Sequence, residues 1–297
     1  MIINKANLTN LTTGFKAAFQ SAFAEVKPTW KSYATYVKST TAIETYAWLG
    51  QFPGMREWIG DRVIKNLETE GYQIRNRDFE QTVAVKRNAI EDDQYGVYTP
   101  MMAAMGAAAG TFPDELTFGQ LKLGFTANGY DRQFFFDTDH PVRQGDGSVV
   151  SVSNLQAGAS TPWFLLDLSK PVKPVIFQDR RPITFVAKDD PRDDNVFDRA
   201  EFVYGADGRM ATGFAFWQLA FGSRANLTTA NFDLAYDSMT VLKGDEGRPL
   251  AIKPTHLVIP PQLRKAADEV IRVQRLAGGA DNPNYARVEV VEVPWLA

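Results

Sequence analysis

The residues best suited to chemistry lie in the short segment DTDHP, where Asp137, Asp139 and His140 fall within four residues. Two carboxylates and an imidazole at this spacing can bind a divalent metal or share acid–base work in catalysis. A metal site needs further ligands, however, and the second histidine of the chain, His256, stands inside the apolar segment THLVIP. We therefore favour a loop in which the aspartates cap turns, and we keep a metal-dependent enzyme as an alternative.

The other candidate motifs give little support to catalysis. The acidic segment DDPRDD, residues 189–194, lacks the glycine and the final glutamate of a calcium-binding loop, so we expect a solvated turn. Phosphate-binding glycine motifs and the GxSxG nucleophile elbow are absent from the sequence. Without cysteine, and with two histidines, an enzyme would depend on carboxylates and lysines. We predict that the protein is not an enzyme and has no cofactor and no metal.

Bulk composition narrows the remaining classes of protein. The 297 residues are enough for one large or two ordinary domains, and 32 basic against 35 acidic residues give a net charge of −3. This balance provides no overall positive field that would attract nucleic acid or an anionic membrane. The sequence contains neither a signal peptide at its start nor an apolar run of about 18 residues. We expect that the protein is synthesised in a cytoplasm and does not associate with a membrane.

An amphipathic helix is predicted over residues 7–26. Its apolar residues recur at steps of three and four, which places them on one face of a helix. They are Leu8, Leu11, Phe15, Phe19, Phe23 and Val26. Two interpretations stay open from the sequence: the helix packs on its own domain, or it is an arm that packs on a neighbouring molecule.

Residues 52–93 are predicted to form a long β-hairpin followed by a strand. Charged residues are interleaved there with single apolar ones, and Phe79, Val83 and Val85 recur with the period of a half-exposed strand. A two-stranded unit with this much charge buries little apolar surface and is marginally stable alone in water. We therefore expect the hairpin to lie on another surface.

A helix rich in small residues is predicted next, with Thr99 as its N-cap and Pro100 at its first position. The segment that follows, MMAAMGAAAG, consists of methionine, alanine and glycine. Side chains this small let another backbone approach closely. We expect a tightly packed core helix, and after Pro113 a second helical segment, DELTFGQLKLGF.

The C-terminal half mixes strands and helices without a regular βαβ alternation, so the predicted fold class is α+β. Strand-like segments are PWFLLDL, KPVIFQ, ITFVA, VFDRAEFVYG, THLVIP and RVEVVEVPWLA. Helices are expected near residues 231–243 and 261–276. Residues 129–160 are rich in Gly, Ser and Asp, which predicts a loop-rich junction between the two halves.

A series of segments, in order along nearly the whole chain, resembles the family of Mu-like phage major head subunits, often called gpT. They are TYAWLGQFPGMREWIGDR, GYQIRNRDFEQTVAVKRNAIEDDQYGVY, FPDEL, FFFDTDHPV, LLDLSKPVKPVIFQDRR, VFDRAEFVYGADGRMATGFAFWQLAF, LAIKPTHLVIPPQLRKAA and VPWLA. One such segment alone would carry little weight, whereas the ordered set is specific. Two departures from the family pattern, around Tyr130 and in GFAFWQ, leave the expected fold unchanged.

The resemblance implies the Hong Kong 97 phage capsid fold. Its parts would be an N-terminal arm at 1–52, an extended hairpin loop at 53–80, a peripheral domain with a long spine helix at 81–145, and an axial domain at 146–297. Some strands of the last segment would return to the peripheral domain. On this fold we expect the small-residue face of the spine helix to lie flat against the peripheral sheet, which keeps the shell thin.

The resemblance also implies a function: a major capsid protein that assembles into the icosahedral shell around phage DNA and enters the virion after assembly in the bacterial host cytoplasm. Expected partners are further copies as hexamers and pentamers, scaffold, protease, portal and decoration proteins, and DNA contacted non-specifically. For inter-subunit contacts we predict hairpin residues and the aromatic stripe of the first helix. They are Arg56, Glu57, Trp58, Asp61, Arg62, Lys65, Glu68, Glu70, Phe15, Phe19 and Phe23.

Two alternatives to this function stay open from the sequence. An encapsulin-like protein compartment has the same fold with a different cargo, and DNA inside purified particles distinguishes the two. The metal-dependent enzyme that would use Asp137, Asp139 and His140 is tested by metal analysis of the pure protein.

Overall fold

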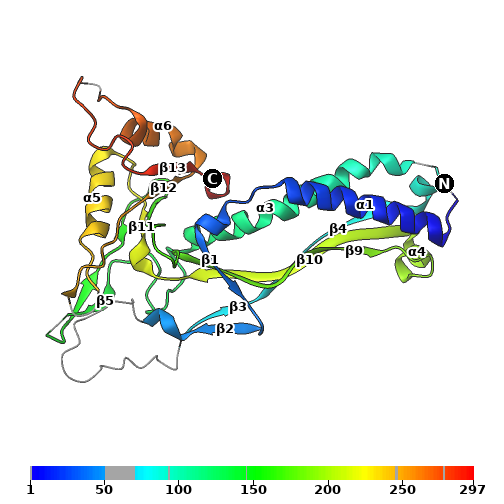
Figure 1. The fold of residues 1–297 in the computed structure, drawn as a ribbon, viewed down its shortest axis with the longest axis horizontal. Helices are drawn as coiled ribbons and strands as arrows, with labels where there is room; N and C mark the ends of the chain where they lie inside the picture. The colour runs from blue at the N-terminus through cyan, green and yellow to red at the C-terminus, as the bar shows by residue number, and fades with distance from the viewer. Residues whose placement is uncertain (1, 51–70, 93, 145, 245–246, 277) are drawn as a thin grey trace.

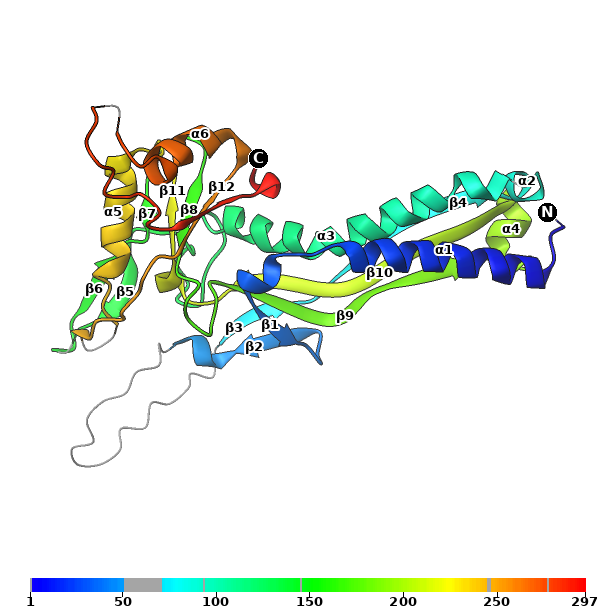
Figure 2. The same cartoon turned by 45° about the horizontal axis from the view of Figure 1, so that its top comes forward.

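A computed structural model of the protein describes residues 2–50, 71–92, 94–144, 146–244, 247–276 and 278–297. It has two parts, a long, narrow one that contains the N-terminus and a shorter one that contains the C-terminus (Figure 1 and Figure 2). We call the described residues of 2–123 and 175–214 the elongated unit, and those of 124–174 and 215–297 the compact unit. The chain therefore passes between the two units three times.

A four-stranded sheet of order β1–β9–β10–β4 runs along the elongated unit. Long strands β9 and β10 are antiparallel, β4 is antiparallel to β10 at one edge, and β1 is parallel to β9 at the other. The bounds are Ala34–Lys38 for β1, Arg77–Lys86 for β4, Val175–Lys188 for β9 and Glu201–Phe214 for β10. The C-terminal half thus returns two strands to a sheet that also contains N-terminal strands.

Two long helices, α1 and α3, cover one face of this sheet (Figure 2). Their bounds are Lys5–Glu25 and Thr99–Leu123. The predicted stripe of α1 is buried from Leu8 to Phe19, and the ring of Phe15 packs edge-on against Tyr204 of β10 at a centroid distance of 5.1 Å. Alternate residues of β4 on the other face, such as Glu80 and Thr82, are exposed. The sheet therefore has one covered and one open face.

Close packing of α1 on α3 depends on two glycines of the small-residue segment. A Cβ atom on Gly106 would lie 2.2 Å from the carbonyl oxygen of Phe19, and one on Gly110 would lie 2.8 Å from Cβ of Val26. The prediction that this face lies flat against the sheet is therefore wrong, because it receives the backbone of the N-terminal helix. This packing also decides between the two interpretations of that helix, since its stripe is buried within its own chain.

Helix α3 is continuous over 25 residues, which corrects the prediction of two segments separated by Pro113. Proline removes one helical hydrogen bond and usually bends or ends a helix. Here buried residues on both sides hold the helix in place, Ala109 and Gly110 before the proline and Thr117 and Phe118 after it. Tertiary packing therefore outweighs the local preference.

Strand β9 is also continuous where the sequence predicted two strands. The register of β9 on β10 shifts between Asp207 and Arg209, opposite Pro182, which also lies beyond the last residue paired with β1. Proline is tolerated at such a bulge on an unpaired edge because little ladder hydrogen bonding is lost. The predicted strand VFDRAEFVYG is instead divided, because its first residues form the short helix α4, Asp194–Arg199, before β10 begins.

The segment predicted as a hairpin over residues 53–80 contains two strands that belong to different sheets. β3, Tyr72–Arg75, pairs antiparallel with β2, Ile43–Tyr46. β4 follows directly and pairs with β10, which confirms a strand with alternating exposure at Phe79, Val83 and Val85. Residues 51–70, between β2 and β3, lie outside the described residues.

A five-stranded sheet of order β13–β12–β8–β11–β7 forms the centre of the compact unit. All four residues of β8 are buried, as a strand covered on both faces requires. The strands are Leu155–Gln156 (β7), Trp163–Leu166 (β8), Ala220–Ser223 (β11), His256–Ile259 (β12) and Glu289–Glu292 (β13). The predicted helices appear as α5, Thr229–Thr240, and as a helical run of η6, α6 and η7 over Pro261–Leu263, Arg264–Ala267 and Asp268–Arg272.

Short elements complete the chain. Within the predicted loop-rich junction, β5 and β6 form an antiparallel hairpin over His140–Arg143 and Val149–Val152. The others are η1 (Trp30–Ser32), η2 (Ala47–Gly50), α2 (Arg87–Glu91), η3 (Gln94–Val97), η4 (Trp217–Leu219) and η8 (Pro294–Leu296). None of the helices in the described ranges combines the length and the hydrophobicity needed to span a lipid bilayer.

One large hydrophobic cluster joins the base of the elongated unit to the compact unit. It contains Trp30 and Phe177 from the elongated unit together with Trp163 and Leu257 from the compact unit. A second cluster lies between α1, α3 and the sheet, further along the elongated unit. The mixed helices and sheets confirm the α+β class.

Candidate functional site

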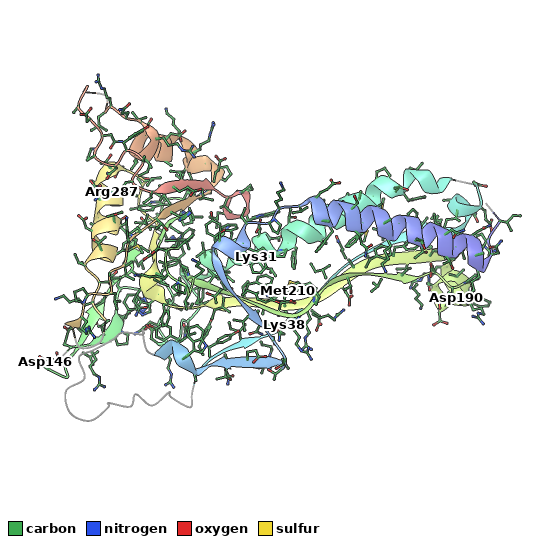
Figure 3. All side chains as sticks on the ribbon, viewed as in Figure 1. Lys31, Lys38, Asp146, Asp190, Met210 and Arg287 are labelled. Carbon is green, nitrogen blue, oxygen red and sulfur yellow. The ribbon has the colours of Figure 1, made fainter. Side chains whose placement is uncertain are left out.

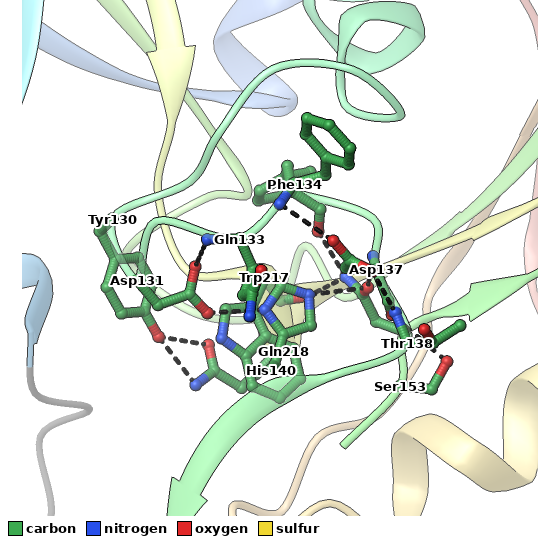
Figure 4. A network of polar contacts seen from close by, with 12 residues as sticks. Tyr130, Asp131, Gln133, Phe134, Asp137, Thr138, His140, Ser153, Trp217 and Gln218 are labelled. Carbon is green, nitrogen blue, oxygen red and sulfur yellow. Dashed lines mark hydrogen bonds and ion pairs between the residues drawn. The ribbon is translucent and has the colours of Figure 1, made fainter. Parts of the chain in front are cut away.

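The DTDHP segment forms a capped turn at the start of β5 (Figure 4). The carboxylate of Asp137 accepts hydrogen bonds from the backbone N–H groups of Phe134, at 3.2 Å, and Thr138, at 2.7 Å. Asp139 is exposed, and its pKa is raised by desolvation and by the negative charge of Asp137. Asp137 thus caps the turn, and Asp139 lies at the surface.

His140 is fully buried and serves packing. Its Nδ1 lies 2.6 Å from a carboxylate oxygen of Asp131, its Nε2 lies 3.0 Å from Oδ1 of Asn154, and its ring stacks on Trp217 at a centroid distance of 4.1 Å (Figure 4). The amide of Asn154 donates to three backbone carbonyls, among them that of Phe135, which fixes its oxygen toward the histidine. Both ring nitrogens are therefore engaged by protein groups, which fixes the orientation of the ring.

These contacts leave the three predicted residues without a common centre. In the part of the chain that the structure describes, three or more His, Asp or Glu side chains nowhere gather closely enough to hold a metal. The two partners of His140, Asp131 and Asn154, escaped the sequence prediction because they lie in loop segments without periodicity. The candidate chemistry of DTDHP is thereby replaced by a structural role.

The acidic segment 189–194 is a hydrogen-bonded turn before α4, as expected from the sequence. Arg192 forms an ion pair with Asp190 at 3.0 Å, and its side-chain and backbone hydrogen bonds lower the pKa of Asp190 to about 2. The backbone N–H of Asp190 donates to Asp193, and Thr12 of α1 donates to Asp189. These carboxylates are thus occupied by protein groups.

The residues predicted for contacts between subunits fall into two sets. Arg56, Glu57, Trp58, Asp61, Arg62, Lys65, Glu68 and Glu70 lie outside the described residues. In the first helix, Phe15 and Phe19 are buried within the chain, whereas the side chain of Phe23 is 37% exposed. Phe23 is therefore the member of the aromatic stripe with surface left for a neighbour.

A buried polar network anchors the strands on either side of residues 51–70. The hydroxyl of Tyr46, at the end of β2, donates to Gln178 of β9 at 2.8 Å. The amide of Gln178 donates to Asn76 at 2.7 Å, and that of Asn76 donates to Ser39 at 2.7 Å. Burial of all these groups makes each hydrogen bond costly to lose. The network holds β2 and β3 firmly on the large sheet.

An apolar groove of about 680 Å³ lies beside the end of α1, between the α1–β1 connection and β9. Its walls include Phe23, Trp30, Tyr36, Ile183 and Met210. Figure 3 shows Met210 near the middle of the molecule, with Lys31 and Lys38 on either side of it. The groove is larger than the apolar hollow of about 210 Å³ between β4 and the Ala109–Phe112 part of α3, and it belongs to the elongated unit.

Comparison with known proteins places this fold in a defined family. Residues 8–296 match the family model described as Mu-like prophage major head subunit gpT. The chain is 41% identical to the major capsid protein of Escherichia phage Mu, with 100% of both chains covered. It is 42% identical to the Mu-like prophage FluMu major head subunit of Haemophilus influenzae, with 88% of this chain and 87% of that protein covered.

Solved structures show the same similarity. A chain in the procapsid of bacteriophage JBD30 is 49% identical, with a TM-score of 0.86 and with 99% of this chain and 100% of that chain covered. In the JBD30 capsid, and in the capsid decorated with minor capsid protein trimers, the matching chains are 41% identical, with a TM-score of 0.79 and complete coverage of both chains.

Proposed function

The chain belongs to the family of Mu-like prophage major head subunits, and from this premise we propose how it builds a shell. As a major capsid protein it is a structural component of the phage head and of the virion, not an enzyme. The observation that carries this conclusion is the match over residues 8–296, together with the TM-score of 0.86 to a procapsid chain. An encapsulin-like compartment is not favoured, because the full-length relatives are phage and prophage head proteins.

Assembly proceeds, in this proposal, through many weak contacts between identical chains arranged as hexamers and pentamers. Each contact is weak enough to be corrected while the shell grows, and the closed shell is stable because every subunit makes several contacts at once. Catalysis is not needed for this process. The open sheet face and the grooves of the elongated unit supply surface that a single chain leaves uncovered.

Residues 51–70 provide one set of these contacts in the proposal, with Trp58 as an apolar anchor among ion-pairing residues such as Arg56, Glu57 and Asp61. Support comes from the sequence, which alternates charged and apolar residues there, and from the network that fixes β2 and β3 on the sheet. The described strands that flank the segment, β2 and β3, are therefore fixed on the sheet.

Trp58→Ala tests this contact. We expect soluble, folded protein that no longer forms shells, because the anchor is lost and the described core is untouched. Trp295→Ala is a matched control, since this tryptophan is 39% exposed in η8, at the opposite end of the sequence. Normal shells from Trp58→Ala would rule out the proposed anchor.

Further partners are proposed from the family. A JBD30 capsid carries minor capsid protein trimers, and we infer that a shell of this chain binds a decoration protein of similar kind. A scaffold, a protease and a portal protein are proposed as partners in head assembly. The enclosed DNA would be contacted non-specifically, in keeping with a net charge of −3 that provides no general attraction to nucleic acid.

Negative-stain electron microscopy of the purified wild-type chain, expressed alone, tests the assembly itself. We expect closed shells, tubes or six-fold rings. Small particles of uniform size at every concentration would contradict assembly by this chain alone. Co-expression with the other head proteins then decides between a scaffold requirement and a failure of the proposal.

A further inference from the structure

The far end of the elongated unit presents an aromatic side chain to solvent. Phe197 in α4 is 88% exposed, although its neighbour Val196 is buried. Helix α4 is held in place on the sheet, because the side-chain amide of Asn195 donates to the carbonyls of Lys188 and Glu201. Ala200 ends the helix with a φ of 50°. A phenyl ring exposed on an ordered support can serve as the apolar anchor of a contact.

Acidic residues surround this ring. Asp194 and Asp198 of α4 are both exposed. Asp194 lies three residues before Phe197 and Asp198 lies directly after it, so the three side chains lie on the same side of the short helix. Segment 189–199 contains five aspartates and two arginines, a net charge of −3. The tip, meaning this segment with Phe197, is therefore an apolar anchor with an acidic rim.

The apolar groove beside the end of α1 has the opposite charge at its rim. The α1–β1 connection and β1, residues 27–38, contain three lysines and no acidic residue. Two carboxylates of other elements bind this segment, Asp179 of β9 at Tyr36 and Lys38 and Asp114 of α3 at the backbone N–H groups of Thr29 and Trp30, so that the segment and its bound carboxylates have a net charge of +1. Lys31 is exposed, and its ammonium lies 5.7 Å above the ring of Trp30 in the groove wall. The one carboxylate in the lining, that of Asp179, is already bound by Tyr36 and Lys38.

The tip and the groove cannot meet within one chain. Figure 3 places Asp190 at the far end of the elongated unit, and Lys31 and Lys38 near the middle of the molecule. Figure 1 and Figure 2 agree on the separation of α4 from β1 along the length of β9. Any contact between the two surfaces must therefore join different copies.

We propose that the tip of one subunit docks in the groove of a second copy, with Phe197 seated among Phe23, Trp30 and Tyr36. The opposite charges of the two rims fix the orientation, and the apolar lining accepts the ring. Because the two surfaces differ, the contact is head-to-tail and leaves a free tip and a free groove for the next copies. The inference rests on the proposed function and assigns residues to one class of its subunit contacts.

Disulfide trapping tests the contact, because the chain contains no cysteine of its own. Asp198→Cys and Tyr36→Cys alter exposed side chains and leave the anchor ring of Phe197 in place, so both variants should fold and assemble. Shells are verified by electron microscopy and oxidised, and a short bismaleimide covers sulfur pairs beyond disulfide reach. Non-reducing and denaturing gels then report the covalent links.

The double variant should give a ladder of covalent multimers, and a mixture of the two single variants should give covalent dimers only. The control pairs Asp198→Cys with Leu234→Cys on α5, whose side chain is 51% exposed like that of Tyr36, and should give no ladder. Dimers from Asp198→Cys alone would mean a tip-to-tip contact and overturn the proposal.

Shells without the link between the two positions would also overturn the proposal, because another segment would then occupy the groove. If the wild-type chain forms no shells, the proposed assembly by this chain alone fails instead. The link is then sought in concentrated unassembled protein, where its absence again overturns the contact.

Discussion

The two units of the molecule bury their apolar residues in different ways. In the compact unit β8 is buried along its whole length, and the rings of Phe136 and Phe164 pack inside at a centroid distance of 5.4 Å. In the elongated unit helices cover one face of the sheet, while the other face, a groove and the ring of Phe197 remain open. The core of the compact unit is thus closed within one chain, although side chains such as Leu234 and Val241 stay exposed at its surface.

This difference indicates that stability and assembly are separated in the molecule. The compact unit and the helix-covered side of the sheet hold the fold together. Exposed residues such as Phe197 contribute almost nothing to the chain's own core, so they are available to other copies. Substitutions should therefore change either the free energy of unfolding or the yield of shells, depending on where they lie.

The largest expected effect is in the compact core. Trp163 is fully buried, and its indole N–H donates to the carbonyl of Ala225 at 2.9 Å. Trp163→Ala should lower the free energy of unfolding by about 3–5 kcal/mol, since a large cavity is left behind. Denaturant unfolding measures the loss. An effect no larger than that of the exposed control Trp295→Ala would break the distinction between core and surface.

The second-largest loss of stability is expected at the buried histidine. His140→Leu leaves the carboxylate of Asp131, which is 9% exposed, without its hydrogen-bond partner, and should cost about 3 kcal/mol. Asp139→Asn, one residue earlier and exposed, should leave the free energy of unfolding close to that of the wild-type chain. Adding Asp131→Asn to His140→Leu should recover part of the loss in a double-mutant cycle. Equal effects of the two single variants at 139 and 140 would contradict the assigned roles.

The packing of α1 on α3 can be tested with two glycines of one helix. Gly106→Ala should destabilise the protein by about 1–3 kcal/mol, because the new methyl group meets the backbone of Phe19. At Gly119 an added Cβ atom would have open space within 4 Å, so Gly119→Ala should stabilise by about 0.5–1 kcal/mol through higher helix propensity. Melting temperatures that move in the same direction would contradict the close helix contact.

The smallest expected effect is on the pH dependence of the melting temperature. The pKa of Asp190 is about 2 in the folded protein, below its ordinary value of 3.8, so its ion pair with Arg192 stabilises above that ordinary value. The contribution is lost as the pH falls from about 4 to 2. Asp190→Asn should therefore show a slightly shallower fall of melting temperature across this range. Identical profiles would mean that the pair adds nothing to stability.

Two regular elements of the elongated unit, α1 and β4, were predicted well from the sequence. The stripe of α1 and the alternation along β4 follow from simple periods, 3.6 and 2, that persist over many residues. The ordered segments also indicated the family, which the full-length matches confirm.

The wrong predictions fall where contacts between residues distant in the sequence decide the local structure. Proline signals at Pro113 and Pro182 predicted breaks, yet packing on α1 and the sheet keeps α3 whole, and a bulge accommodates β9. The partner of His140 is a loop aspartate nine residues upstream, for which no period exists. The small-residue face of α3 was recognised, but which backbone it receives depends on tertiary structure.

The most direct test of the separation between assembly and stability is sedimentation velocity of Phe197→Ala beside the wild-type chain, with melting temperatures for both. We predict that the variant loses fast-sedimenting shells and keeps the wild-type melting temperature. Shells in wild-type yield, or a variant that melts several degrees lower, would contradict that separation.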